Sequence, residues 1–342
     1  MPQRIIEDLP PNARDPDPDT DTDVPEARGA GALDLYDRWE QHNWRISDLD
    51  LAGDRPAWDA LPAPVRDGLL TGLAGLFLGE VSVTETLAPL AHGAPRHDHQ
   101  LYLCTQLADE ARHTLFFQRC LDALVGPDAH RPQDLHTPGR RTEAFADVVE
   151  HRLGELTSAV RPGGDPAHWY RAVTLYHLMA EGVLAMTLLH SLARTVDALP
   201  GLPALSEGLA RVARDEARHA AFGVIALREG VREGHREVIA REVFDGIPAA
   251  AMALVDPERR LITPLGLRAL TVRQGRALVE QWEAAAATLR RRLVRIGLPD
   301  LADEARHAWF RACERAVTAY EDRYGTHPSR SAGRPPGGEA NE

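Results

Sequence analysis

The string Asp-Glu-Ala-Arg-His occurs at 109–113 and again at 215–219. In each copy the glutamate precedes the histidine by three residues, and on an α-helix this spacing places both side chains on one face, about 5–6 Å apart at Cβ. Each glutamate–histidine pair could therefore hold one metal ion from a single helical turn. Two such turns facing one another would form a dinuclear metal site. The two pairs are Glu110 with His113, and Glu216 with His219.

A dinuclear site inside a four-helix bundle also needs one glutamate from each of two further helices. The segment 69–90 has apolar residues at helical spacing, and Glu80 lies on this apolar stripe whereas Glu85 does not. The segment 169–192 is almost entirely apolar, with Glu181 as its only carboxylate. A buried carboxylate needs a metal, a cation or a proton as partner. Along the chain, a single glutamate is followed by a glutamate–histidine pair, and this sequence of one glutamate and one pair then repeats. The four-helix bundle requires this order.

Taken alone, either pair is more simply explained as a surface glutamate beside an unrelated histidine, since helices are rich in charged residues. The two copies on apolar stripes, together with two isolated core carboxylates in the right order, reverse this preference. We therefore predict a metal site.

Positioning these residues requires long helices, and the rest of the chain supplies them. Segments rich in Ala, Leu, Glu and Arg have helical periodicity, and no alternation typical of strands competes with it. We expect an all-α bundle over 31–325, with disordered tails at 1–30 and 326–342 because of their Pro-, Gly- and acid-rich composition. The predicted loops are 93–98, 126–140, 161–166 and 199–203.

Composition excludes several classes of protein. A formal net charge of −12 argues against nucleic acid as a partner. The N-terminal segment lacks the basic start and apolar run of a secretory signal, and no uninterrupted apolar stretch reaches about 18 residues. We expect a soluble cytoplasmic protein without a membrane span. The cysteines, Cys104, Cys120 and Cys313, are odd in number and scattered, so a disulfide framework is not expected.

At this point the motifs carry a resemblance that covers residues 35–230. The chain resembles the ferritin-like dimetal carboxylate proteins, and more narrowly the ligand-binding oxidases that are similar to the ribonucleotide reductase small subunit. The matching stretches are 39–58, 79–90, 109–121, 176–187 and 214–223. The resemblance implies a ferritin-like four-helix bundle core with flanking helices. It also implies six metal ligands, namely Glu80, Glu110, His113, Glu181, Glu216 and His219.

The resemblance has further implications for chemistry. In that family a valine three residues after the first ligand glutamate is joined by an ether bond to a tyrosine five residues before the third. These positions are Val83 and Tyr176, for which ordinary core packing is the alternative explanation. The implied cofactor is a manganese–iron pair, with two iron ions as the second choice, and dioxygen is the co-substrate. A fatty-acid-like ligand, an electron donor and a homodimer are also expected.

Residues around the ligands can be predicted on physical grounds. Metal-bound imidazoles usually donate their other ring N–H to a carboxylate, which fixes the tautomer. We expect Asp215 to bond His113 and Asp109 to bond His219. Trp44 matches a tryptophan that extends the Asp215 side of this network in the reductases, or else is simply a core aromatic.

Three other features of the sequence need an interpretation. Arg112 and Arg218 are two residues from each ligand glutamate, nearly opposite on the helix, and are interpreted as ion pairs at the edge of the bundle. His177 precedes Glu181 by four residues and is either an extra ligand, a pocket residue or, as we prefer, a hydrogen-bonded core histidine. A third copy of the motif, at 303–307, lies outside the matched region and is interpreted as helix-forming sequence without metal.

Two other functions remain open. A ribonucleotide reductase small subunit normally stores its radical on a tyrosine four residues after the first ligand histidine, where this chain has Phe117. Some such subunits also have phenylalanine there, but the C-terminal segment here offers little that could dock on a large subunit. A non-catalytic iron-binding bundle of the ferritin type is the third possibility.

Overall fold

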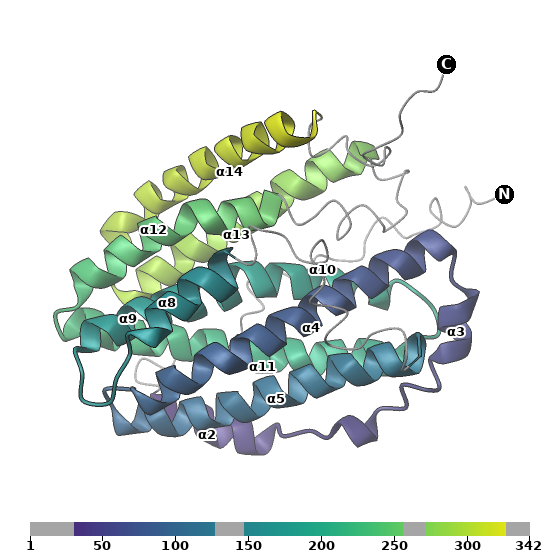
Figure 1. The fold of residues 1–342 in the computed structure, drawn as a ribbon, viewed down its shortest axis with the longest axis horizontal. Coiled ribbons are helices and arrows are strands. Elements are labelled where there is room, and N and C mark those ends of the chain that lie inside the picture. Colours follow the sequence, from purple (N-terminus) through teal and green to yellow (C-terminus); the bar gives the residue numbers. More distant parts are fainter. Residues whose placement is uncertain (1–30, 127–146, 256–270, 326–342) are drawn as a thin grey trace.

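The computed structural model describes residues 31–126, 147–255 and 271–325. Within these ranges every regular element is a helix, which confirms the all-α prediction (Figure 1). The tails predicted to be disordered, 1–30 and 326–342, and nearly all of the predicted loop at 126–140 lie outside the described residues. The other predicted loops agree with breaks between helices.

Four long rods form the bundle that carries the predicted site residues (Figure 1). The first two, α4 and α5, pack along one another, and the third packs on α11. The rods are α4 (Ala63–His92), α5 (His97–Leu124), the continuous run of α9 (Pro166–Val173), η4 (Thr174–Ala185) and α10 (Met186–Asp197), and α11 (Pro203–Arg232).

Further helices cover the bundle. The helix α2 packs on α5 and α11, α12 and α13 pack on η4, and α14 packs on α12 and α13 as an outer layer (Figure 1). The bounds of the remaining described elements are α2 (Ala32–Gln41), η2 (Ile46–Asp48), α3 (Arg55–Ala60), η3 (Asp147–Arg152), α8 (Leu153–Ser158), α12 (Arg236–Val255), α13 (Thr271–Ile296), η7 (Pro299–Leu301) and α14 (Ala302–Tyr324).

Local sequence explains where two of the rods begin. Asp165 accepts a hydrogen bond from the Ala167 backbone N–H, which caps the first turn of α9 after Pro166. The first turn of α11 is capped from a distance, because the buried Asp54 carboxylate accepts from two of its backbone N–H groups, at 3.2 and 2.8 Å. This contact fixes the start of the helix that carries the second motif.

The central part of the third rod is π-helical over Thr174–Ala185. Such stretches are rare and are found frequently at functional sites. This one carries Tyr176, His177 and Glu181, three of the residues singled out in the sequence. The apolar pattern of the segment predicts a helix but does not reveal the change in hydrogen bonding.

The prediction of no membrane span rests on the lack of an uninterrupted apolar stretch. By average hydropathy over 18 residues, however, two helical segments are long and apolar enough to cross a membrane, Val65–His92 and Pro166–Asp197. In the second segment 78% of the most apolar window is buried inside the bundle, which is typical of the core helix of a soluble protein; in the first the share is 29%. Length and apolar composition alone are weak support for a membrane span.

Candidate metal centre

The predicted ligands come from all four rods and meet in the interior of the bundle. Glu80 lies on α4, the first pair on α5, Glu181 on η4 and the second pair on α11. The exposed fractions are 9% for Glu80, 1% for Glu110, 0% for His113, 3% for Glu181, 4% for Glu216 and 0% for His219. Four carboxylates buried this deeply need compensating positive charge.

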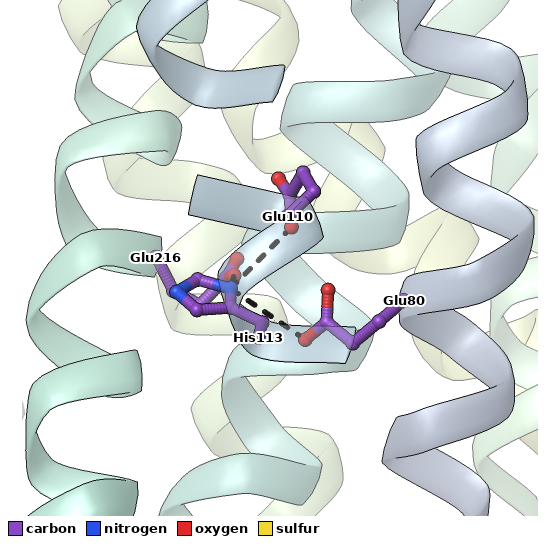
Figure 2. A group of neighbouring side chains, drawn as sticks. All are labelled: Glu80, Glu110, His113 and Glu216. Carbon is purple, nitrogen blue, oxygen red and sulfur yellow. Dashed lines mark ion pairs between the residues drawn. The ribbon is translucent and has the colours of Figure 1, made fainter. Parts of the chain in front are cut away.

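The first group of ligand atoms surrounds the Nδ1 atom of His113 (Figure 2). This nitrogen lies 3.2 Å from Glu216 Oε1, 3.4 Å from Glu110 Oε2 and 3.8 Å from Glu80 Oε1. One ligand atom from each of the four side chains lies within 4.8 Å of the others. A single cation between them would contact three carboxylates and one imidazole.

The second group surrounds Nδ1 of His219. This nitrogen lies 3.2 Å from Glu110 Oε1, 3.6 Å from Glu216 Oε1 and 3.9 Å from Glu181 Oε1. Glu110 therefore offers one carboxylate oxygen to each group, and Glu216 lies near both histidines. Two carboxylates shared in this way would bridge a pair of neighbouring ions.

Orphaned polar atoms test whether metal ions fit this arrangement. The Nδ1 atoms of His113 and His219 and the Oε2 atom of Glu181 are buried without a hydrogen-bond partner. Buried polar atoms are nearly always satisfied, and the two Nδ1 atoms each face a group of carboxylates. Carboxylate oxygens with imidazole nitrogens are a donor set that suits iron and manganese. The residues present therefore fit two such ions.

The electrostatics of the carboxylates show the same need for cations. Burial, followed by the negative charge of Glu110, raises the pKa of Glu80 well above its usual range, and burial, followed by Glu216, does the same for the pKa of Glu181. Burial also opposes ionisation of Glu110, but His219 and His113 hold its pKa well below the ordinary value. Without metal, protonated imidazoles supply the positive charge.

Despite burial, the pKa values of both ligand histidines are raised by the neighbouring carboxylates. Burial lowers the pKa of His113, yet the neighbouring carboxylates of Asp215 and the ligand glutamates raise it well above the ordinary value overall. For His219, the charges of Glu110 and Glu216 likewise outweigh burial and raise the pKa. Metal binding must displace these protons, because only the neutral imidazole is a ligand.

Both expected aspartate–histidine bonds are present. His113 Nε2 lies 3.2 Å from Asp215 Oδ2, and His219 Nε2 lies 3.1 Å from Asp109 Oδ2. An Nε2–H donated to each carboxylate leaves both Nδ1 atoms free to bind a metal. Trp44 donates its indole N–H to Asp215 Oδ2 at 2.8 Å, which extends this side of the network as anticipated.

Both motif arginines form ion pairs as predicted, but the expectation that they lie at the edge of the bundle is wrong for Arg218, which is buried. Arg218 is only 6% exposed and donates to Asp109 Oδ2 at 2.6 Å and to Asp215 Oδ1 at 2.8 Å. Arg112 pairs with the same two aspartates. The arginines do point away from the ligand groups, but on that face lie two buried aspartates that need a cation. They therefore hold in place the carboxylates that orient both histidines.

Sequence reasoning missed Gln106. Its side-chain N–H₂ group donates to Glu181 Oε1 at 2.7 Å and to Glu110 Oε1 at 3.2 Å, and its carbonyl oxygen lies 3.0 Å from His177 Nε2. His177 is fully buried and is absent from both ligand groups, so it is the hydrogen-bonded core histidine. The available signal was spacing, since Gln106 is four residues before Glu110 on the same helical face.

The two residues implied as ether partners are associated with the same large hydrophobic cluster. The Tyr176 hydroxyl is buried 3.4 Å from Glu110 Oε1. Val83 is partly buried and packs against the hydrophobic cluster that includes Tyr176. Phe117 is fully buried in the neighbouring cluster with Trp44.

The third motif copy does not form a comparable group among the described residues. Glu304 and His307 are both exposed on α14, and neither belongs to either ligand group. Asp303 and Glu304 lie in the first turn of α14, after the short helix η7, where negative charge favours the helix dipole. This agrees with its interpretation as helix-forming sequence.

Comparison with known proteins supports the fold. No family model matches the sequence. Among solved structures, a variant of an R2-like ligand-binding oxidase with an anaerobically reconstituted Mn/Fe cofactor aligns with a TM-score of 0.63 at 20% identity, covering 79% of this chain and 94% of that one. The chain has the fold of these oxidases. A second oxidase of this kind, with a metal cofactor reconstituted in air, gives 0.59 at 19% identity over 86% and 95% of the two chains.

Proposed function

We propose that this protein is a dioxygen-activating dimetal carboxylate oxidase that oxidises C–H bonds of a bound, apolar or fatty-acid-like ligand. The observation that carries this proposal is the pair of ligand groups that share Glu110, each with an orphaned histidine Nδ1 atom. The fold of R2-like ligand-binding oxidases supports the same reaction class. All six expected ligands belong to these two groups, with Glu110 in both.

The proposed ions are manganese in the first group and iron in the second, with two iron ions as the alternative. R2-like oxidases with Mn/Fe cofactors share the fold, and the carboxylate-rich donor set suits both metals. When bound, the pair would supply oxygen activation and one-electron steps. Glu110 and Glu216, which lie near both histidines, would help to hold both ions, and Asp109 and Asp215 would fix the tautomers of the two histidines.

Tyr176 and Val83 are the proposed internal substrates. Burial, followed by the charge of Glu110, raises the pKa of Tyr176 well above its usual range, so the phenol keeps its proton. Forming an ether removes one hydrogen from the phenol and one from a valine carbon, which releases two electrons and two protons. With two further electrons from the metal ions and two further protons from solvent, one dioxygen molecule is reduced to two water molecules.

The proposed partners follow from the same assignment. An apolar ligand would lie between helices of the bundle, where ligand sites are common. An external electron donor would return the oxidised metals to their starting state. We also propose a homodimer in the cytoplasm, on the strength of the resemblance alone.

A mass measurement tests this function. The purified metal-free protein is loaded with Mn²⁺ and Fe²⁺ under nitrogen, exposed to air, and weighed intact before peptide mapping. We expect a loss of two hydrogens, mapped to cross-linked peptides that hold Val83 and Tyr176. Tyr176→Phe should bind the same metals and keep its full mass. An unmodified mass in the loaded wild-type protein would contradict the cross-link, and failure to bind metals would contradict the whole assignment.

The same sample separates the other two functions. A reductase small subunit would form a stable complex with a large catalytic subunit, whereas the proposed oxidase would act without one. A ferritin-type iron-binding bundle would take up iron and oxidise it, but would leave the protein and any bound ligand without a C–H oxidation product.

A further inference from the structure

We propose that Trp39, together with Tyr36, forms an electron-transfer route from the surface of α2 to the second ligand group. The proposal rests on the function proposed above and names how electrons reach that centre. Trp39 was not singled out in the sequence, where only Trp44 was considered as a tryptophan that extends the network of a ligand histidine.

The route begins with a chain of three side chains. The Trp39 indole N–H donates to Asp109 Oδ1 at 2.8 Å, and the other oxygen of that carboxylate lies 3.1 Å from His219 Nε2. The opposite ring nitrogen of His219 faces the carboxylates of the second group. An indole, a carboxylate and an imidazole thus connect α2 to the predicted metal position through hydrogen bonds.

A second chain of the same composition runs to the first group, from Trp44 through Asp215 to His113. The two tryptophans differ in their surroundings. Trp44 is 7% exposed, and two arginine guanidinium groups lie over its ring, Arg112 at 5.0 Å and Arg211 at 5.7 Å from the centroid. Positive charge over an indole ring stabilises the neutral ring and makes removal of an electron harder.

Trp39 differs from Trp44 in its exposure. It is half-buried, and its ring centroid lies 5.9 Å from that of Tyr36, which is also half-buried. Their helix carries exposed carboxylates at Asp34, Asp37 and Glu40. These exposed carboxylates would attract a positively charged donor to the surface of α2. The Arg112 guanidinium pairs with both Asp109 and Asp215 and therefore does not distinguish the two chains. The greater exposure of Trp39 gives its chain the better access to solvent.

The electron balance of the route is simple. With oxidised ions bound, the Trp39 indole would give up one electron to them, and its N–H proton would move along the hydrogen bond toward Asp109. A one-electron donor of positive charge at the surface of α2 then reduces the indole, directly or through Tyr36, and the proton returns. The donor loses one electron, a metal ion gains one, and Trp39 is unchanged.

A purely structural role is the alternative, because a half-buried indole N–H needs an acceptor in any case. Trp39→Phe keeps most of the apolar contact and removes the N–H and the oxidisable ring. Trp309→Phe is the matched control: its indole is fully buried on α14 and also loses a hydrogen bond, to the Trp282 carbonyl oxygen. Metal content and thermal midpoint are measured for both variants.

The test is the reduction of the air-oxidised centre by the methyl viologen cation radical, followed by stopped-flow absorbance. In Trp39→Phe the rate constant should fall by at least about tenfold, equivalent to about 1.4 kcal/mol of barrier, at unchanged metal content. Trp309→Phe should match the wild-type rate, and Trp44→Phe should slow reduction less than Trp39→Phe. Equal rates in wild type and Trp39→Phe would overturn the route alone, whereas a wild-type protein that bound no metal would overturn the proposed function as well.

A second readout does not depend on the rate of the loaded protein. Repeated air oxidation with too little reductant should add oxygen atoms to the side chain of Trp39 or Tyr36. An oxidising equivalent that leaves the metal centre would be trapped on these two rings. Tandem mass spectrometry locates this modification within the peptide that also contains Trp44. Oxidation concentrated on Trp44 instead would overturn the proposal.

Discussion

At the scale of single residues, Glu110 is the side chain on which the site depends most. Its two oxygens face different histidines, at 3.4 Å from His113 Nδ1 and 3.2 Å from His219 Nδ1. Gln106 and Tyr176 contact the same carboxylate. A change at this residue therefore affects both ligand groups, whereas a change at Glu80 or Glu181 affects one.

Glu110→Gln should lower the bound metal from two ions per chain to less than one. The amide is neutral and offers a single acceptor oxygen, so it cannot bridge two cations. The measurement is metal content by mass spectrometry after anaerobic loading and desalting. Glu304→Gln, the same change in the exposed third motif copy, is the matched control and should still bind two ions. Equal metal content in both variants would contradict the assignment.

At the scale of elements, the close contact of α5 with α11 holds the two motifs together. Gly208 lies on α11 where a Cβ atom would meet the Phe116 ring of α5 at 2.2 Å. A rigid aromatic ring, itself fully buried, can move only by displacing its neighbours, which include Trp44 at a ring-centroid distance of 5.9 Å. The spacing of the ligand pairs therefore depends on a glycine about two helical turns before the second motif.

Gly208→Ala should destabilise the protein although alanine is the better helix former. Overpacking a core costs about 1–3 kcal/mol, while replacing glycine with alanine inside a helix gains at most about 1 kcal/mol. Gly154→Ala on α8 is the control, since nothing lies within 4 Å of the added Cβ atom and only the gain applies. Thermal or urea unfolding should show a lower midpoint for the first variant and an equal or higher one for the second. A stabilised Gly208→Ala would refute the close-packing argument.

At the scale of the whole molecule, periodicity and motif spacing predicted most of the architecture. The apolar stripes locate the helices, and a glutamate and histidine three residues apart on one helix must share a face, so Glu110 and His113 converge wherever the helix lies. The sequence could not reveal contacts between distant elements. The burial of Arg218 between two aspartates and the bond from Trp39 to Asp109 depend on how α2, α5 and α11 cross.

The π-helical stretch was missed for a related reason. Its residues are mostly apolar, and that pattern is compatible with either hydrogen-bonding scheme until neighbouring helices impose one. Gln106 was missed because its side chain is neutral. Unlike a buried carboxylate, it does not require a metal, a cation or a proton as partner, so nothing in the sequence singled it out. Its role follows only from the carboxylates that it contacts.

The most direct test of the central claim is anomalous X-ray scattering, at the manganese and iron absorption edges, from crystals of the metal-loaded protein. The account predicts two peaks inside the bundle, separated by about 3.5–4 Å, as in other two-metal sites. One should lie against Nδ1 of His113 and the other against Nδ1 of His219, with Glu110 between them. A single peak, peaks at the third motif on α14, or no metal at all in a loaded crystal would contradict it.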